Sequence, residues 1–163
     1  VRAVCRDSPP IDQSRVHIVI LHPPCPNSED ADLDTNNASL VLRLSHGEVD
    51  FLFSGDIEAA GERVLLASAQ SLSSEILKVP HHGSRTSSTP EFVTAVSAEV
   101  AVASLGFQNH FRFPALEVVQ RYRAQGGEML RTDQAGAVTV VSDGKGYTLS
   151  TILPLSNSIR SIQ

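Results

Sequence analysis

The chain has 163 residues, enough for one domain with a buried core, and 41% of them are hydrophobic, as in ordinary globular proteins. No stretch reaches the roughly 20 consecutive apolar residues that a membrane-spanning helix requires. Thirteen basic and 18 acidic residues give a net charge of −5. This balance excludes a broadly basic nucleic-acid binder, so any contact with DNA must be local, metal-assisted or made by residues outside this sequence.

The N-terminal end does not match a signal peptide, and it begins at Val1 rather than at Met. This start predicts a fragment or a processed piece of a longer protein. Two cysteines, Cys5 and Cys25, could pair in an oxidising compartment, but their spacing does not decide it. Neither belongs to a Cys-x-x-Cys motif, so we expect no functional role for them.

Short β-branched and apolar runs, separated by Pro, Gly and Asn, predict strands along most of the chain. In chain order they cover residues 16–21, 39–44, 49–53, 75–80, 100–103, 128–131, 137–142 and 146–152. The short turn at His46-Gly47 predicts an antiparallel hairpin, and Asp143-Gly144 predicts a second. Residues 1–15 and 23–37 are expected to be irregular, and residues 155–163 are expected to form a disordered tail.

Three helices are predicted between these strands. The first follows Asp56, where Ile57, Val64, Leu65 and Ser68 share one face at helical spacing. The second has Thr89 as its N-cap and Pro90 at its first position, and it runs to about Ser97. The third starts at Pro114 and is ended by Gly126-Gly127.

Strands and helices alternate in the middle of the chain, while hairpins occupy both ends. This order predicts an α/β layered domain with a mixed sheet and flanking helices, formed by residues 1–163 together.

The first candidate for chemistry is Asp56, directly after a predicted buried strand. Open α/β sheets bind their ligands at the carboxyl ends of strands, and a carboxylate there is a good ligand for a divalent cation. The alternative is an N-cap, because Asp before a helix commonly accepts backbone N–H groups. From Asp56 alone, the cap is the favoured reading.

The second candidate is the run His81-His82-Gly83-Ser84, which also follows a strand. Side chains of neighbouring residues in an extended chain face opposite ways, so one imidazole can bind metal or act as general acid while the other supports it. We therefore assign catalytic roles to His81, His82 and Ser84, and a metal role to His82. Arg85 would then be a phosphate contact. The alternative is a surface loop with polar residues and no such role.

The other histidines give weaker signals. His110 lies in a loop expected at the same sheet edge as Asp56, so we include it as a metal ligand, and Arg112 beside it could contact a phosphate. His17 is expected to be packed or solvent-facing. His22 is expected to cap a strand or face the site, and His46 is expected at a turn surface.

Four segments together resemble a known family: Asn36–Leu42, Phe51–Asp56, the run from Leu77 to Ser88 with its Lys-Val-Pro-His-His-Gly-Ser core, and Arg131–Val138. They resemble the C-terminal metallo-β-lactamase-like domain of the ComEC/Rec2 competence proteins. The resemblance extends from about residue 16 to residue 142. The histidine-containing run is its most specific part.

The resemblance implies an αββα sandwich and hydrolysis that depends on one or two divalent ions, Zn²⁺ or Mn²⁺. It implies Asp56 as a metal-bridging carboxylate, with His81 and His82 as acid or metal-proximal donors. It also implies a domain on the periplasmic side of the inner membrane, joined to a channel that imports one DNA strand, and a nuclease or phosphodiesterase acting on the other.

The sequence departs from that family in two places. No match to the superfamily's upstream His-x-His/Asp-x-Asp-His cluster occurs in residues 1–55, so the chain resembles the second half of the domain. Phe113-Pro114-Ala115 stands where many relatives carry His-Pro-His, which leaves His110 as the candidate replacement. A half sandwich exposes an apolar sheet face, and we therefore expect a homodimer, association with the remaining half, or low stability.

Three functions follow from these observations. The first is a metal-dependent nuclease in the intact DNA-uptake protein, with this chain alone inactive. The second is a degenerate module that binds or assembles, and the third is a separate metallo-hydrolase of a small phosphate ester or lactone.

Overall fold

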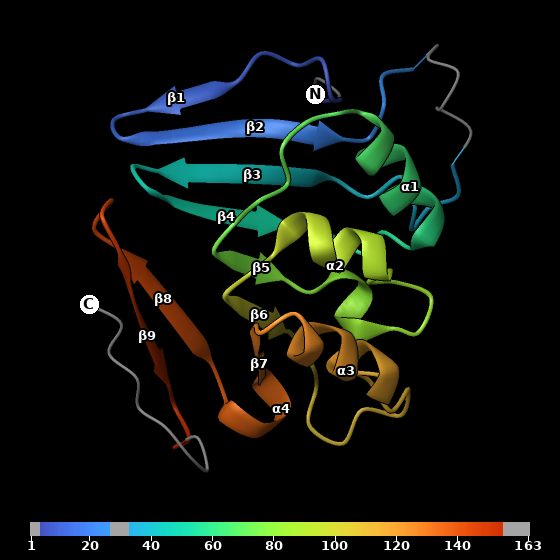
Figure 1. The fold of residues 1–163 in the computed structure, drawn as a ribbon, viewed down its shortest axis with the longest axis vertical. Helices are drawn as coiled ribbons and strands as arrows, with labels where there is room; N and C mark the ends of the chain where they lie inside the picture. The colour runs from blue at the N-terminus through green and yellow to red at the C-terminus, as the bar shows by residue number, and fades with distance from the viewer. Residues whose placement is uncertain (1–3, 27–32, 155–163) are drawn as a thin grey trace.

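The computed structural model describes residues 4–26 and 33–154, and the predicted disordered tail at 155–163 lies outside them. It is a mixed α/β structure built on a seven-stranded sheet (Figure 1). The strands are β1 Ile11–Gln13, β2 Val16–His22, β3 Val41–His46, β4 Val49–Phe53, β5 Ile76–Lys78, β6 Val100–Ala103 and β7 Glu128–Arg131. A separate hairpin consists of β8 Val138–Ser142 and β9 Tyr147–Thr151.

The sheet has an antiparallel end and a parallel end. Strands β1 to β4 pair antiparallel with their chain neighbours, whereas β4, β5, β6 and β7 run parallel. Parallel neighbours need crossovers, and these contain α1 Ala59–Ala67, α2 Pro90–Val96 and α3 Leu116–Ala124. The mixed sheet and the hairpin at His46-Gly47 confirm the predicted α/β class.

The three helices cover one face of the sheet and form the main core with it (Figure 1). Leu52, Leu77 and Ala101 project from three adjacent strands into this core and are fully buried. From α2, Phe92 packs into the same core, also fully buried. This core fixes the positions at which β4, β5 and β6 end, and thereby the loops that follow them.

The opposite face of the sheet is covered over only part of its width. Under β8 and β9, Ile76, Val100 and Leu130 form a second apolar cluster. At the antiparallel end the same face continues through Ile18 and Leu44 and reaches Phe53 and Ile11, which are 42% and 54% exposed. The described structure therefore has the partly uncovered apolar face that the sequence predicts.

Four element predictions need correction. Residues 11–13 form β1, because pairing with β2 orders a segment whose own sequence is polar. The short helix α4, Thr132–Ala135, was not predicted. Helix α1 begins after Glu58 rather than after Asp56, and α3 begins after Ala115 rather than at Pro114.

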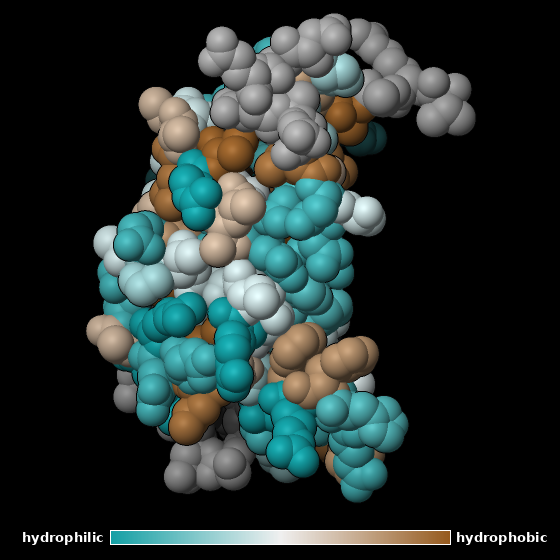
Figure 2. Space-filling view, turned by 90° about the vertical axis from the view of Figure 1, so that its right-hand side faces the viewer, coloured by the Kyte–Doolittle hydropathy of each residue, from teal (hydrophilic) through white to brown (hydrophobic). Residues whose placement is uncertain are grey.

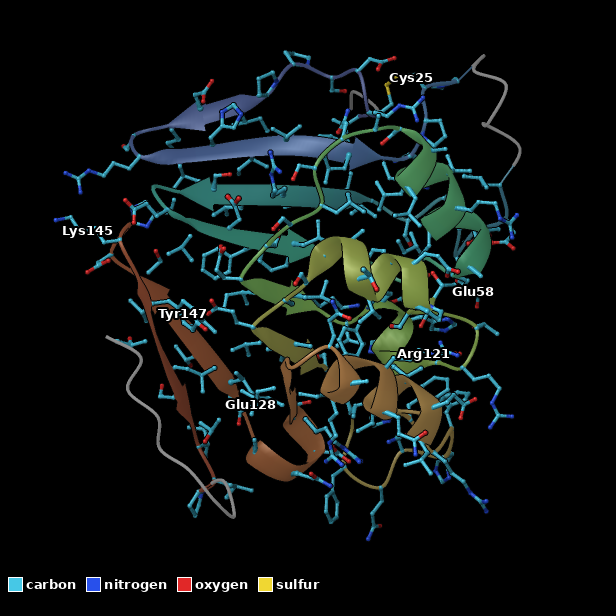
Figure 3. The ribbon with its side chains drawn as sticks, viewed as in Figure 1. Cys25, Glu58, Arg121, Glu128, Lys145 and Tyr147 are labelled. Carbon is cyan, nitrogen blue, oxygen red and sulfur yellow. A yellow bond between two sulfur atoms is a disulfide. The ribbon has the colours of Figure 1, made fainter. Side chains whose placement is uncertain are left out.

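The N-terminal segment is tied to the end of β2 by a disulfide between Cys5 and Cys25 (Figure 3 labels Cys25). This answers the question that the spacing left open. No helix in residues 4–26 and 33–154 is long and apolar enough to cross a membrane.

Candidate functional site

The predicted site residues lie where three parallel strands end. Asp56 follows β4, the segment Pro80–Gly83 follows β5 as a tight 3₁₀ turn, and Ser104 follows β6. Because the carboxyl ends of parallel strands meet at one sheet edge, their loops come together there. Figure 2 looks onto this edge, which is the right-hand side of Figure 1.

Asp56 is not a helix cap. The N-cap position of α1 is Glu58, and the carboxylate of Asp56 points instead to a cation, with Oδ1 3.2 Å from the Nζ of Lys78. The backbone N–H of Asp56 donates to Ser39 Oγ at 3.0 Å, and Lys78 Nζ also donates to the carbonyl of Gly55 at 2.7 Å. These contacts fix the carboxylate at the sheet edge, and with a side chain 42% exposed it remains open to solvent.

His82 faces Asp56 in a defined orientation. Its Nδ1 lies 2.6 Å from the carbonyl oxygen of Ser104, and its Nε2 lies 3.6 Å from Oδ1 of Asp56. A carbonyl can only accept, so Nδ1 is the nitrogen that carries the proton. In the neutral ring, Nε2 then presents a lone pair toward the carboxylate. Metal-binding histidines use this arrangement, with the second nitrogen held by a carbonyl or carboxylate.

His81 has a different environment. Its Nδ1 lies 3.0 Å from Oε1 of Glu58, a contact off the direction of a hydrogen bond, and its ring meets Phe113 edge-on at 5.8 Å between centroids. Glu58, labelled in Figure 3, also accepts from Thr86 Oγ1 at 2.9 Å. The two histidines therefore contact two different carboxylates.

The backbone of this turn is strained. His81, His82 and Gly83 have φ values of 43°, 56° and 82°, and left-handed backbone is costly for residues with a Cβ. A Cβ at position 83 would lie 2.5 Å from Cβ of Pro114, so only glycine fits there. The turn and the loop before α3 are thus packed directly against each other.

A cleft of about 490 Å³ opens beside these groups. Its lining residues are Asp56, His81, His82, Ser104, Leu105, Gly106, Asn109, Phe111 and Phe113. The lining includes a carboxylate, two imidazoles and two phenylalanine rings.

Two of the predicted site residues lie away from this cleft. Ser84 is buried, with its hydroxyl 2.9 Å from Thr86 Oγ1, and His110 is exposed and absent from the lining. Among the described residues, no group of three His, Cys, Asp or Glu side chains is positioned to hold a metal ion. The catalytic role of Ser84 and the metal role of His110 remain predictions.

The other three histidines have structural contacts. His17 is 46% exposed and pairs with Asp12 at 2.6 Å, as expected for a packed or solvent-facing residue. His22 is buried and bonded to the carbonyl of Asn37, so it does not face the cleft. His46 is partly buried and lies 3.1 Å from Ser142 Oγ, because the β8–β9 turn folds over it, so the prediction of a turn-surface residue is wrong.

Sequence reasoning missed three side chains at this edge: Glu58, Lys78 and Glu62. Glu62 is fully buried and accepts from Ser88 N, Thr89 N and Thr89 Oγ1, so it holds the start of α2. Burial raises the pKa of its carboxyl. A charged residue inside the apolar stripe of a predicted helix is the signal that could have found it.

Comparison with known proteins finds that the chain is similar to segments of competence proteins. It is 43% identical over 112 residues to competence protein ComA of Neisseria gonorrhoeae, covering 68% of this chain and 16% of ComA. It is 30% identical over 148 residues to ComE operon protein 3 of Bacillus subtilis, covering 91% of this chain and 18% of that protein. Recombination protein 2 of Haemophilus influenzae is 30% identical over 105 residues, covering 64% of this chain and 13% of that protein. These homologues support the ComEC/Rec2 competence family.

The ComEC/Rec2 resemblance drawn from the sequence motifs is thus confirmed at the level of the competence family. The chain spans between 13% and 18% of the length of these relatives. No protein-family model matches the chain.

Proposed function

We propose that this chain is part of a DNA-uptake protein and contributes Asp56 and His82 to a metal-dependent phosphodiesterase site that cleaves DNA. The observation that carries the proposal is the orientation of His82, whose Nε2 faces Asp56 while Ser104 holds Nδ1. An imidazole lone pair opposite a carboxylate oxygen provides two ligands for a cation.

The donor chemistry suits a divalent ion such as Zn²⁺ or Mn²⁺, both of which accept imidazole and carboxylate ligands. A bound divalent ion would neutralise the negative charge of a phosphodiester and polarise it. The chain's own residues would supply ligands for the ion and a proton for the leaving group. Asp56 and His82 would hold the ion, and His81, which lines the same cleft beside Glu58, would supply a proton to the leaving oxygen.

A hydrolytic metal site needs at least three protein donors, and two converge in the described part of the chain. We propose that the remaining donors come from residues outside this sequence, in the other half of a metallo-β-lactamase-like αββα sandwich. The uncovered apolar face at the antiparallel end supports this, because a second sheet would bury it.

The proposal includes a place for the domain on the periplasmic side of the inner membrane, joined to a membrane channel. The disulfide between Cys5 and Cys25 supports an oxidising compartment, since such bonds persist there and are rare in the cytosol.

A second candidate is a module that has lost catalysis and serves in binding or assembly. It is favoured by Phe113, which lines the cleft. Phe113 stands where many family members carry a histidine, and a phenylalanine ring cannot bind a metal.

Metal titration of the purified chain separates these candidates. We expect calorimetry with Mn²⁺ or Zn²⁺ to detect one bound ion, and Asp56→Ala and His82→Ala each to weaken binding at least tenfold, as for lost metal contacts. His17 and Asp12 form a matched His–Asp pair at the other end of the sheet, so His17→Ala is the control and should leave binding unchanged. Binding that His17→Ala reduces as much would favour the second candidate, whereas no binding at all would mean that the chain alone holds an incomplete or a degenerate site.

A further inference from the structure

We propose that the loop between β6 and α3, residues 104–115, presents Phe107 and Phe111 as a stacking platform for the bases of an unpaired DNA strand, with Arg112 and Arg85 on its phosphates. The inference rests on the proposed function and specifies the form of DNA that this edge recognises.

The exposure of the two phenylalanines is the first observation. Phe107 is 79% exposed and Phe111 is 76% exposed, the two highest values among the exposed large hydrophobic residues of the described chain. Large apolar side chains exposed to water are unfavourable where they gather, so two phenylalanines on one short loop indicate a binding surface. Figure 2 shows apolar side chains on this edge beside strongly hydrophilic ones.

The second observation is a succession of rings that leads from solvent to the candidate site. Phe111 stacks on Phe113 at 5.5 Å between centroids, Phe113 meets His81 at 5.8 Å, and His81 lies 6.3 Å from His82. A base on Phe111 would therefore continue a row of rings whose other end is the cleft. The adjoining phosphate would then lie toward Asp56 and His82.

The loop is held in shape rather than free. Asn109 accepts from Phe113 N at 2.8 Å and donates to Phe113 O at 3.0 Å, and the N–H of Arg112 donates to the Asn109 carbonyl. Gln108 and Arg112 adopt left-handed φ values of 52° and 57°. Strained backbone of this kind concentrates at functional sites, and here each strained residue directly follows one of the two exposed phenylalanines.

Charge favours a nucleic acid over an apolar peptide. Residues 81–89 and 104–116 contain two arginines and no Asp or Glu, in a chain whose net charge is −5. A second hollow of about 440 Å³ shares Phe111 and Phe113 with the cleft and adds Arg85, Arg112, two hydroxyls and the carboxylate of Glu117. Arg85 pairs with Glu117 at 2.9 Å, whereas Arg112 has no carboxylate partner among the described residues.

Exposed aromatic rings beside cations are the means by which proteins bind single strands, because every unpaired base has a face to stack. In a duplex the faces are already stacked on one another, and the rings would have nothing to contact. The arrangement therefore selects unpaired DNA.

The test is fluorescence anisotropy of the full chain with a short labelled oligothymidylate, in EDTA so that no metal contributes. We expect Phe111→Ala to weaken binding about tenfold, and Phe107→Ala somewhat less. Phe111→Trp should retain binding. Phe53→Ala, which removes another exposed ring on the uncovered sheet face, is the matched control and should change nothing. Arg112→Ala should reduce the slope of log affinity against log salt by about 0.7.

The test is completed with an abasic oligomer of the same length and with a duplex. The wild type should bind both about as weakly as the Phe111→Ala variant binds the oligothymidylate. Equal binding of the abasic strand or the duplex by the wild type would overturn the proposal. So would an absence of oligothymidylate binding, or selective capture of an apolar peptide by the same rings. The metal titration contains no DNA and this assay contains no metal, so each proposal can fail alone.

Discussion

The two ends of the seven-stranded sheet are built from similar apolar strands but are covered differently. At the parallel end, β5, β6 and β7 have helices on one face and the β8–β9 hairpin on the other, and the candidate site lies where β4, β5 and β6 end. At the antiparallel end, β1 to β4 have helices on one face only. The strands beside the candidate site are thus covered on both faces, while the other end retains apolar surface for a partner.

The largest expected contrast is between a leucine at each end. Leu77 of β5 is fully buried in the main core, and Leu77→Ala should lower the free energy of unfolding by about 3 kcal/mol. Leu44 of β3 lies on the uncovered face and is only half-buried, so Leu44→Ala should cost about 1 kcal/mol. Urea unfolding monitored by circular dichroism measures both.

Equal losses for the two variants would contradict this contrast and would mean that the uncovered face is buried in solution. Repeating the unfolding at lower protein concentration then identifies the homodimer predicted from the sequence, because the stability of a dimer falls on dilution.

The disulfide gives the next effect. It closes a separation of 20 residues at the antiparallel end, and reduction should lower the free energy of unfolding by about 3 kcal/mol at most. Hydrogen exchange should show the loss of protection first in β1, which pairs only with β2. The variant with both Cys5→Ser and Cys25→Ser is the control and should not respond to reductant. Uniform loss of protection across β5 and β6 would contradict a local role.

The smallest effect distinguishes the two ends by pH. His22, at the end of β2, is buried with Nε2 bonded to Asn37 O and Nδ1 without a partner among the described residues, and burial lowers its pKa below 6.5. The folded state therefore binds a proton less readily than the unfolded chain. Stability falls as the pH drops below 6.5 and levels off once the pH passes the lowered pKa.

Glu62 on α1 has the opposite sign, because burial raises the pKa of its carboxyl above 4.5. The folded state binds this proton more readily, so stability falls as the pH rises from 4.5 through the raised pKa. Unfolding free energies of wild type, His22→Gln and Glu62→Gln across this range should give differences of opposite slope, because burial lowers the pKa of His22 and raises the pKa of Glu62. Slopes of the same sign for the two variants would contradict the opposite directions given for the pKa shifts of His22 and Glu62.

Much of the fold could be predicted from the sequence, because β-branched runs between turn residues are local signals. The edge location of Asp56 and His82 followed from the same runs, since both residues come directly after strands. Strand β1 could not be predicted, because Ile11-Asp12-Gln13 becomes a strand only through its register with Val16–Ile18. The position of His110 could not be predicted either, because Asn109 and Phe113 set the path of that loop through contacts between nonadjacent residues.

The order of strands across the sheet is the order of the chain, from β1 to β7. During synthesis from the N-terminus, each strand therefore emerges beside a partner that has already been made, and no strand must wait unpaired for a distant one. The three crossover helices are completed in the same sequence, one between each pair of parallel strands. Growth on the ribosome would proceed from the disulfide-linked edge toward the parallel end, with β8 and β9 closing over the last strands.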